Sequence, residues 1–128
     1  MRLLLDTHTF LWFITDDPLL SRAARALIAD PGNESVISAA SYWEVAIKVN
    51  LGKYPLTVPF EQFLTDGIKG NDFAILPVEI RHAVVLSQLP MHHKDPFDRM
   101  IIAQALADQI SVVSLDVAFD SYGVTRLW

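Results

Sequence analysis

The chain has 128 residues, of which 52% are hydrophobic and 20% are charged, and this balance excludes an intrinsically disordered protein. A chain of this length buries about two-thirds of its unfolded surface, so we expect one domain over residues 1–128. The absence of cysteine rules out disulfides, thiol nucleophiles and thiolate metal sites, and the net charge of −5 argues against binding nucleic acid through a positive surface.

The elements predicted for the first half of the chain are short apolar strands and helices. In chain order they are a strand over 2–5, helices over 7–14 and 21–29, a strand over 35–38, and helices over 39–51 and 60–69. Gly52 follows the helix over 39–51 and is a plausible cap for its C-terminus. We expect Trp43 to lie in the core together with Trp12 and Phe13, with an exposed partner groove as the alternative for Trp12.

In the second half of the chain, predicted strands and helices continue to alternate. In chain order the sequence predicts a strand over 73–76, a helix over 79–87, a polar loop over 89–94, a helix over 96–108, a strand over 110–114, a short helix over 115–121 and a strand over 124–127. The strands are apolar and β-branched along their whole length, which is typical of a parallel sheet covered on both faces. We therefore expect a three-layer α/β/α sandwich with a mainly parallel sheet of four or five strands.

Four acidic residues fall where predicted strands end or helices begin. Asp6 follows the first strand directly, and Asp116 lies two residues past the strand over 110–114. Glu44 lies in the first two turns of the helix after the second strand, and Asp98 lies in the first turn of its helix. In an open parallel sheet, the carboxyl ends of strands and the N-termini of the following helices share one edge, where ligands bind. The chain order therefore places three of these acids at that edge, and Asp98 joins them if its helix begins there.

Four carboxylates gathered without a partner repel one another, by about 4 kcal/mol for a pair roughly 4 Å apart at an effective dielectric constant of about 20. Such a cluster takes up protons or binds a cation. Oxygen ligands without cysteine or paired-histidine spacing suit Mg²⁺ or Mn²⁺. A cation of this kind can bind phosphate oxygens and activate water for in-line attack, and it would neutralise a phosphate that the acidic chain repels.

Each acid also has a purely structural explanation. Asp6 and Asp116 could cap the helices that follow them, and Glu44 has Lys48 four residues later, at the spacing of a surface ion pair. Asp95 precedes a proline in the pattern of a helix cap, so we interpret it as structural. Capping does not explain why all these acids fall at one sheet edge, and the prediction therefore rests on the set.

Other polar residues give weaker indications. His92 and His93 are adjacent and cannot easily face one ion together, so we expect both in a solvent-exposed loop. His8 is expected to be packed or bonded to water. Arg99, Lys48 and Lys94 are candidates for contacts to RNA phosphates, with ordinary surface charges as the alternative.

Four segments resemble, in chain order, the four sequence motifs of PIN domains. They are Met1–His8, Ser41–Lys48, His93–Ala105 and Ser114–Val124. The resemblance covers essentially the whole chain and is closest to the VapC-type toxins of bacterial and archaeal toxin–antitoxin pairs. The third segment holds two acids, and its spacing to the apolar residues that follow assigns the motif acid to Asp98, which leaves the role of Asp95 open.

The resemblance implies an endoribonuclease that cleaves RNA phosphodiesters with Mg²⁺ or Mn²⁺. It assigns metal-binding and catalytic roles to Asp6, Glu44, Asp98 and Asp116. Asp6 and Asp98 would be the most direct ligands, and the other two would complete the site directly or through water. It also implies a homodimer and a VapB-type antitoxin whose C-terminal segment fills a groove and blocks the site.

Two other functions stay open. One is a non-catalytic interaction module that has lost its metal, which the presence of all four acids disfavours. The other is a small-molecule phosphohydrolase of the haloacid-dehalogenase kind, which uses a second aspartate two residues after the first, where this chain has His8. Every apolar run ends before the ~18 residues of a membrane span, and Asp6 and Asp16 interrupt the leading one, so we expect a soluble, cytoplasmic protein.

Overall fold

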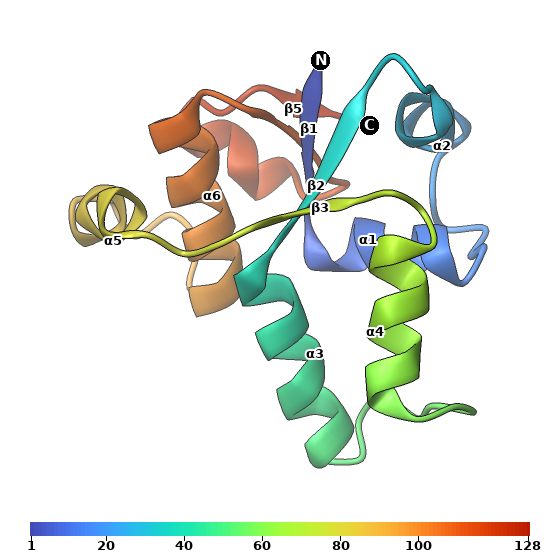
Figure 1. The fold of residues 1–128 in the computed structure, drawn as a ribbon. Helices are drawn as coiled ribbons and strands as arrows, with labels where there is room; N and C mark the ends of the chain where they lie inside the picture. The colour runs from blue at the N-terminus through green and yellow to red at the C-terminus, as the bar shows by residue number, and fades with distance from the viewer.

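The computed structural model describes residues 1–128 and places helices on both faces of a five-stranded sheet (Figure 1). All strand pairs are parallel, and the strand order is β3-β2-β1-β4-β5. The strands are β1 (Arg2–Leu5), β2 (Glu34–Ser38), β3 (Ala74–Leu76), β4 (Ser111–Val113) and β5 (Arg126–Leu127). The helices are α1 (Thr7–Ile14), α2 (Arg22–Ala29), α3 (Ala39–Asn50), α4 (Phe60–Lys69), α5 (Ile80–Ser87), α6 (Pro96–Asp108) and the 3-10 helix η1 (Val117–Tyr122). The predicted three-layer fold with a parallel sheet is confirmed.

The sheet buries apolar side chains on both faces because successive residues of a strand point to opposite sides. Leu3 and Leu5 of β1 lie in one core cluster together with Phe10 of α1. Leu4, between them, belongs to a second cluster that includes Ile101 of α6. A sheet covered in this way explains why its strands are apolar along their whole length and do not alternate with polar residues.

Three strands lead directly into capped helices at the carboxyl edge of the sheet. Asp6 caps α1, Ser38 caps α3 and Asp116 caps η1, each by accepting a hydrogen bond from a backbone N–H of the first turn. Leu5 is in register with Ile37 of β2 and Val113 of β4. The residues that follow these partners therefore lie side by side, and this edge carries several buried polar side chains, among them Asp6, Ser38 and Ser114.

The predicted element boundaries hold to within about one residue until the C-terminal part of the chain. There the short helix is a 3-10 helix that begins two residues later than expected, and the last strand is reduced to Arg126–Leu127. Helix α3 ends with Leu51 as its C-cap, and Gly52 follows with a φ of 72°, a left-handed conformation that glycine adopts without strain. None of the helices combines the length and the apolar run that would let it cross a membrane.

The predicted core position of Trp43 is wrong, because this residue is 62% exposed. Helix α3 instead turns Glu44 and Val45 inward. The first half of α3 packs against the polar edge of the sheet. The apolar residues at helical spacing, Trp43, Ile47 and Leu51, are therefore exposed and do not form the buried face of this helix. Trp12 and Phe13 are half-buried and pack against the core, as predicted.

Candidate metal centre

Asp6 lies at the carboxyl end of the central strand β1 and is 5% exposed. Its Oδ1 accepts a hydrogen bond from the Thr9 backbone N–H at 2.8 Å, and its Oδ2 accepts one from the Ser114 hydroxyl at 2.5 Å. Burial raises the pKa of Asp6 above its usual 3.8, while the bonds from Ser114 and Thr9 lower it. The carboxylate is therefore held in one orientation by elements on both sides of the strand.

Glu44 comes from the inner face of α3, and its side chain is only 8% exposed. The predicted ion pair with Lys48 is present, at 2.9 Å between Lys48 Nζ and Glu44 Oε2. It is not the surface pair that the sequence suggested, because the carboxylate is buried. The other oxygen, Oε1, is buried without a hydrogen-bond partner, which is costly for a carboxylate unless a cation or water reaches it.

Asp98 lies in the first turn of α6, where its surroundings disfavour the ionised form. Its pKa is raised from 3.8 to about 7, first by burial and then by the negative charges of Asp95, Asp6 and Glu44, while His93 acts in the opposite direction. These influences mean that carboxylates from β1, α3 and α6 lie close enough to repel one another. The interpretation of Asp95 as a helix cap agrees with its Oδ1, which accepts bonds from the N–H groups of Phe97 and Asp98.

Asp116 joins this group through His93. The His93 Nε2 lies 3.1 Å from Asp98 Oδ2 and 2.9 Å from Asp116 Oδ2, and the three atoms lie within 4.8 Å of one another. The other oxygen of Asp116 accepts the Ala118 N–H at 2.9 Å and so caps η1. The expectation that both loop histidines face solvent is wrong for His93, whereas His92 is exposed and contacts the Tyr122 ring.

The arrangement fits a hard divalent cation. The candidate ligand atoms are carboxylate oxygens from four separate parts of the chain. Mg²⁺ and Mn²⁺ prefer oxygen ligands of this kind. Two observations favour a bound cation at these oxygens: the unpartnered Oε1 of Glu44 and the raised pKa of Asp98. A divalent cation among these oxygens would remove both sources of instability.

The remaining polar candidates have other roles. Arg99 donates from Nη1 to the carbonyl oxygens of Pro90 and His93 and to the Tyr122 hydroxyl, and from Nη2 to the Leu89 carbonyl. Arg99 therefore holds the loop before α6 in place, a role that neither of the two alternatives from the sequence, a phosphate contact or a surface charge, described. Lys94 is exposed and forms no ion pair. His8 is exposed and is not packed in the interior, although its ring stacks on Trp12 with 5.5 Å between ring centroids.

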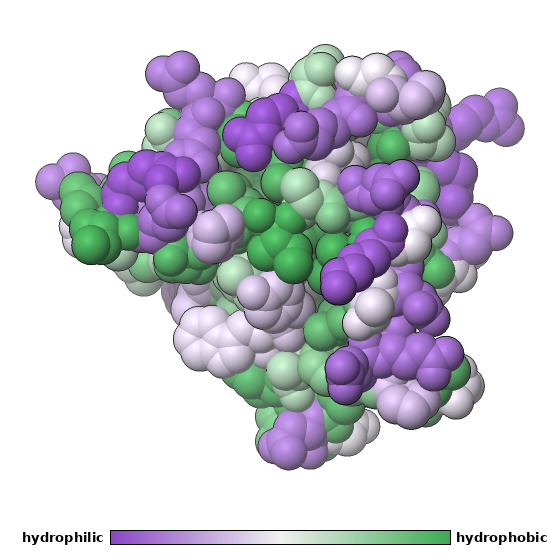
Figure 2. Space-filling model, in the orientation of Figure 1, coloured by the Kyte–Doolittle hydropathy of each residue, from purple (hydrophilic) through white to green (hydrophobic).

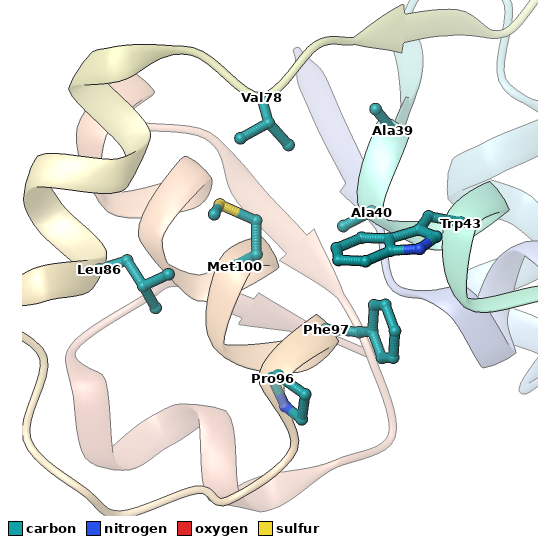
Figure 3. Close-up of a pocket in the computed structure, with 8 residues that line it drawn as sticks. All are labelled: Ala39, Ala40, Trp43, Val78, Leu86, Pro96, Phe97 and Met100. Atoms are coloured by element: carbon teal, nitrogen blue, oxygen red, sulfur yellow. The ribbon is translucent and has the colours of Figure 1, made fainter. Parts of the chain in front are cut away.

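An apolar groove of about 450 Å³ opens beside the acids, between α3, α5 and α6 (Figure 3). The rings of Trp43 and Phe97 meet edge to face at its rim, with 5.1 Å between centroids. Trp43 directly precedes Glu44, and Phe97 directly precedes Asp98. The groove therefore shares two helices with the acidic cluster, although its own walls are apolar.

Comparison with known proteins decides the family. A sequence model of the PIN domain family matches residues 3–124. The chain belongs to the PIN domain family. A segment of 58 residues of this PIN domain is also 36% identical to Ribonuclease VapC16 of Mycobacterium tuberculosis, a match that covers 45% of this chain and 41% of that protein.

Solved structures share the fold over nearly the full length of the PIN domain. VapBC2 from Rickettsia felis, crystallised with a fragment of promoter DNA, has a chain that superposes with a TM-score of 0.72 at 15% identity, covering 99% of this chain and 98% of that one. FitAcB from Neisseria gonorrhoeae gives a TM-score of 0.65 at 20% identity, covering 98% and 96%. VapBC-5 from Mycobacterium tuberculosis gives 0.63 at 20% identity, covering 98% of each chain. At these identities the likeness establishes the shared fold.

Proposed function

We propose that this PIN domain is a Mg²⁺- or Mn²⁺-dependent endoribonuclease and the toxin of a toxin–antitoxin pair. The observation that carries the proposal is that acids from distant parts of the chain act on Asp98, whose pKa is raised to about 7 first by burial and then by their negative charges. Carboxylates crowded in this way bind a divalent cation readily, because the cation replaces mutual repulsion with attraction. The name of the relative, Ribonuclease VapC16, supports RNA as the substrate.

The four acids would hold the cation unequally. The unpartnered Oε1 of Glu44 and the Oδ1 of Asp98, which the His93 contact leaves available, are the oxygens best placed to bind it. Asp6 already accepts one hydrogen bond on each oxygen, and each keeps a second lone pair for the cation. Asp116 is 40% exposed and is committed to η1 and His93, so it would complete the site through water.

A divalent cation held there would supply Lewis acidity for hydrolysis of a phosphodiester. The protein contributes position and charge. The Thr9 N–H and the Ser114 hydroxyl favour the ionised form of Asp6 and orient it, and Lys48 balances the charge of Glu44. The scissile phosphate would lie at the carboxyl edge of the sheet, because all four acids gather where strands end and helices begin.

The same proposal includes partners. Several structural neighbours are named as VapBC or FitAB assemblies, and we propose that a VapB-type antitoxin pairs with this chain and blocks the acidic site through its C-terminal segment. Acting on cellular RNA under such control would place the protein in the cytoplasm.

A homodimer is the second part of the assembly that we propose. Helix α3 and its C-cap expose Trp43, Ile47 and Leu51 at four-residue intervals, and α5, across the apolar groove, exposes Ile80 and Val84. Figure 2 shows apolar side chains on the face that carries these helices, with polar ones among them. Exposed apolar side chains gathered on one face are typical of interaction surfaces, and a second copy of the chain would bury them.

The test compares purified wild-type protein with Asp6→Asn on single-stranded RNA, with Mg²⁺ or Mn²⁺ and with EDTA. We expect cleavage by the wild type with metal only, and a loss of at least a hundredfold in Asp6→Asn. The matched control is Asp66→Asn, because Asp66 is an exposed acid on α4 outside the site. Cleavage that persists in EDTA and in Asp6→Asn would refute the mechanism. Turnover of a simple phosphate ester without RNA cleavage would favour a phosphohydrolase, and binding without any turnover would favour an interaction module.

A further inference from the structure

The tautomer of His93 is set by the start of α6. The Asp95 backbone N–H donates to His93 Nδ1 at 3.1 Å, so Nδ1 acts as an acceptor and carries no hydrogen. The hydrogen of the imidazole is then on Nε2, the atom that lies between Asp98 Oδ2 and Asp116 Oδ2. This nitrogen is therefore a hydrogen-bond donor in the site. To ligate a metal it would need its hydrogen on Nδ1, directly against the Asp95 N–H.

Contacts of its backbone and of its ring hold His93 in place. Its backbone N–H donates to the Tyr122 hydroxyl at 2.7 Å, and its carbonyl accepts from Arg99. Its ring meets Phe119 of the core edge on, with 6.0 Å between centroids. These contacts come from α6 and η1, and they hold the imidazole with only 15% of the side chain exposed.

We infer that His93 is a positioning residue of the metal centre: its Nε2–H donates to Asp116 Oδ2, and the same nitrogen contacts Asp98 Oδ2 at 3.1 Å, so the ring holds Asp116 beside Asp98. Without His93, no other side chain in the structure links these two carboxylates, and the Asp116 side chain is 40% exposed at the start of η1. With His93 in place, Asp116 Oδ2 accepts its hydrogen, Asp98 Oδ2 faces the ring, and Asp98 Oδ1 is left for the cation. Hydrogen bonds that orient a ligand from behind commonly contribute tenfold to a hundredfold to metal affinity.

This inference rests on the proposed metal-dependent function, and its test reads metal binding directly. Mn²⁺ affinity is measured by isothermal titration for wild type, His93→Leu, His93→Gln and His92→Leu. We expect His93→Leu to bind Mn²⁺ about tenfold or more weakly. His93→Gln keeps an amide N–H that can donate to Asp116 in place of the imidazole, so it should stay within a few-fold of wild type. His92→Leu is the matched control and should bind as wild type, and circular dichroism checks that each variant is folded.

The outcomes separate the two proposals. A wild-type protein that binds no Mn²⁺ overturns the proposed function and this inference with it. A wild type that binds Mn²⁺ with an affinity that His93→Leu leaves unchanged overturns this inference alone.

Electron spin-echo spectra of bound Mn²⁺ show whether His93 is a hydrogen-bond donor or a metal ligand. We expect no nitrogen coupling from a directly bound imidazole, and such a coupling, lost in His93→Leu, would overturn the donor role. Nitrogen NMR of the metal-free protein should show the hydrogen of His93 on Nε2, and a hydrogen on Nδ1 would overturn the argument without any metal.

Discussion

The Asp98→Asn substitution should stabilise the metal-free protein at pH 8 while it removes a ligand of the proposed metal centre. Asp98 carries a raised pKa of about 7 because its ionised form is buried among the charges of Asp95, Asp6 and Glu44. In the unfolded chain its pKa returns to about 3.8. The folded protein therefore holds a proton that the unfolded chain has lost, and the free energy of unfolding falls as the pH rises from about 4 to about 7. Asparagine is isosteric and uncharged, so it removes this penalty.

The size of the effect follows from the pKa shift. A rise from 3.8 to about 7 corresponds to about 4 kcal/mol at full strength. The side chain is 24% exposed, and solvent screens part of the repulsion, so we expect a gain of about 2 kcal/mol in the free energy of unfolding at pH 8. For a domain of this size that is roughly 5–10 °C in the melting temperature.

The assay is thermal unfolding of wild type and Asp98→Asn in EDTA at pH 5 and pH 8, and again with excess Mg²⁺. The gap between the two proteins should shrink at pH 5, where wild-type Asp98 is protonated. Mg²⁺ should stabilise wild type, by about 2.7 kcal/mol at a hundred times its dissociation constant, and leave the variant unchanged. Asp66→Asn removes an exposed acid and should change stability by less than about 0.5 kcal/mol. A variant that is less stable than wild type in EDTA at pH 8, or a gap that does not depend on pH, would contradict the reasoning.

Two further predictions concern other parts of the molecule. Hydrogen bonds from Arg81 and His82 lower the pKa of Asp108, at the end of α6, to about 2, so the stabilising contribution of Asp108 is present above pH 4 and is lost as the pH falls towards 2. Because Arg81 is half exposed and solvent weakens the pair, Asp108→Asn should lower the free energy of unfolding by about 1 kcal/mol at pH 7. Urea denaturation measures this change, and an unchanged free energy of unfolding would contradict the role of this contact. Trp43→Lys should convert the proposed dimer to a monomer, as measured by the molecular mass from light scattering after gel filtration. Val117→Lys, a matched change at another exposed apolar residue, should leave the dimer intact. A wild-type protein with the mass of a monomer would refute the proposed dimer.

The fold and the placement of the acids could be predicted because both depend on short-range pattern. Apolar strands that do not alternate require cover on both faces, and that requirement leads to a parallel sheet with connecting helices. In such a sheet a residue just after a strand lies at the carboxyl edge, whatever the details of packing. Asp6 and Asp116 were placed by this rule alone, and the capping contacts that they make do not prevent them from lying at the site.

The positions of Trp43 and His93 could not be predicted because they depend on contacts between distant segments. A helical period marks an apolar stripe, but it does not say whether the protein core or another chain covers it, and α3 buries Glu44 in place of that stripe. His93 is set by Tyr122, which lies 29 residues further along the chain, and by Arg99 on the following helix. One local signal was present: a histidine two residues before a helix cap can accept the N–H of the capping residue.

Three positive side chains around the site are already committed to contacts within the protein. Lys48 is paired with Glu44, Arg99 is bonded to loop carbonyls, and Arg126 is paired with Asp120 beside the loop that carries Asp116. None of these groups can move to an RNA phosphate without breaking a contact that shapes the site. Lys94, in the loop before α6, is the exception, because it is exposed and forms no ion pair. With a net charge of −5, the protein offers a phosphodiester at this edge little positive charge beyond this lysine. The divalent ion should therefore supply most of the charge that attracts the phosphate as well as the charge that activates it, so removing the metal should abolish catalysis and weaken RNA affinity.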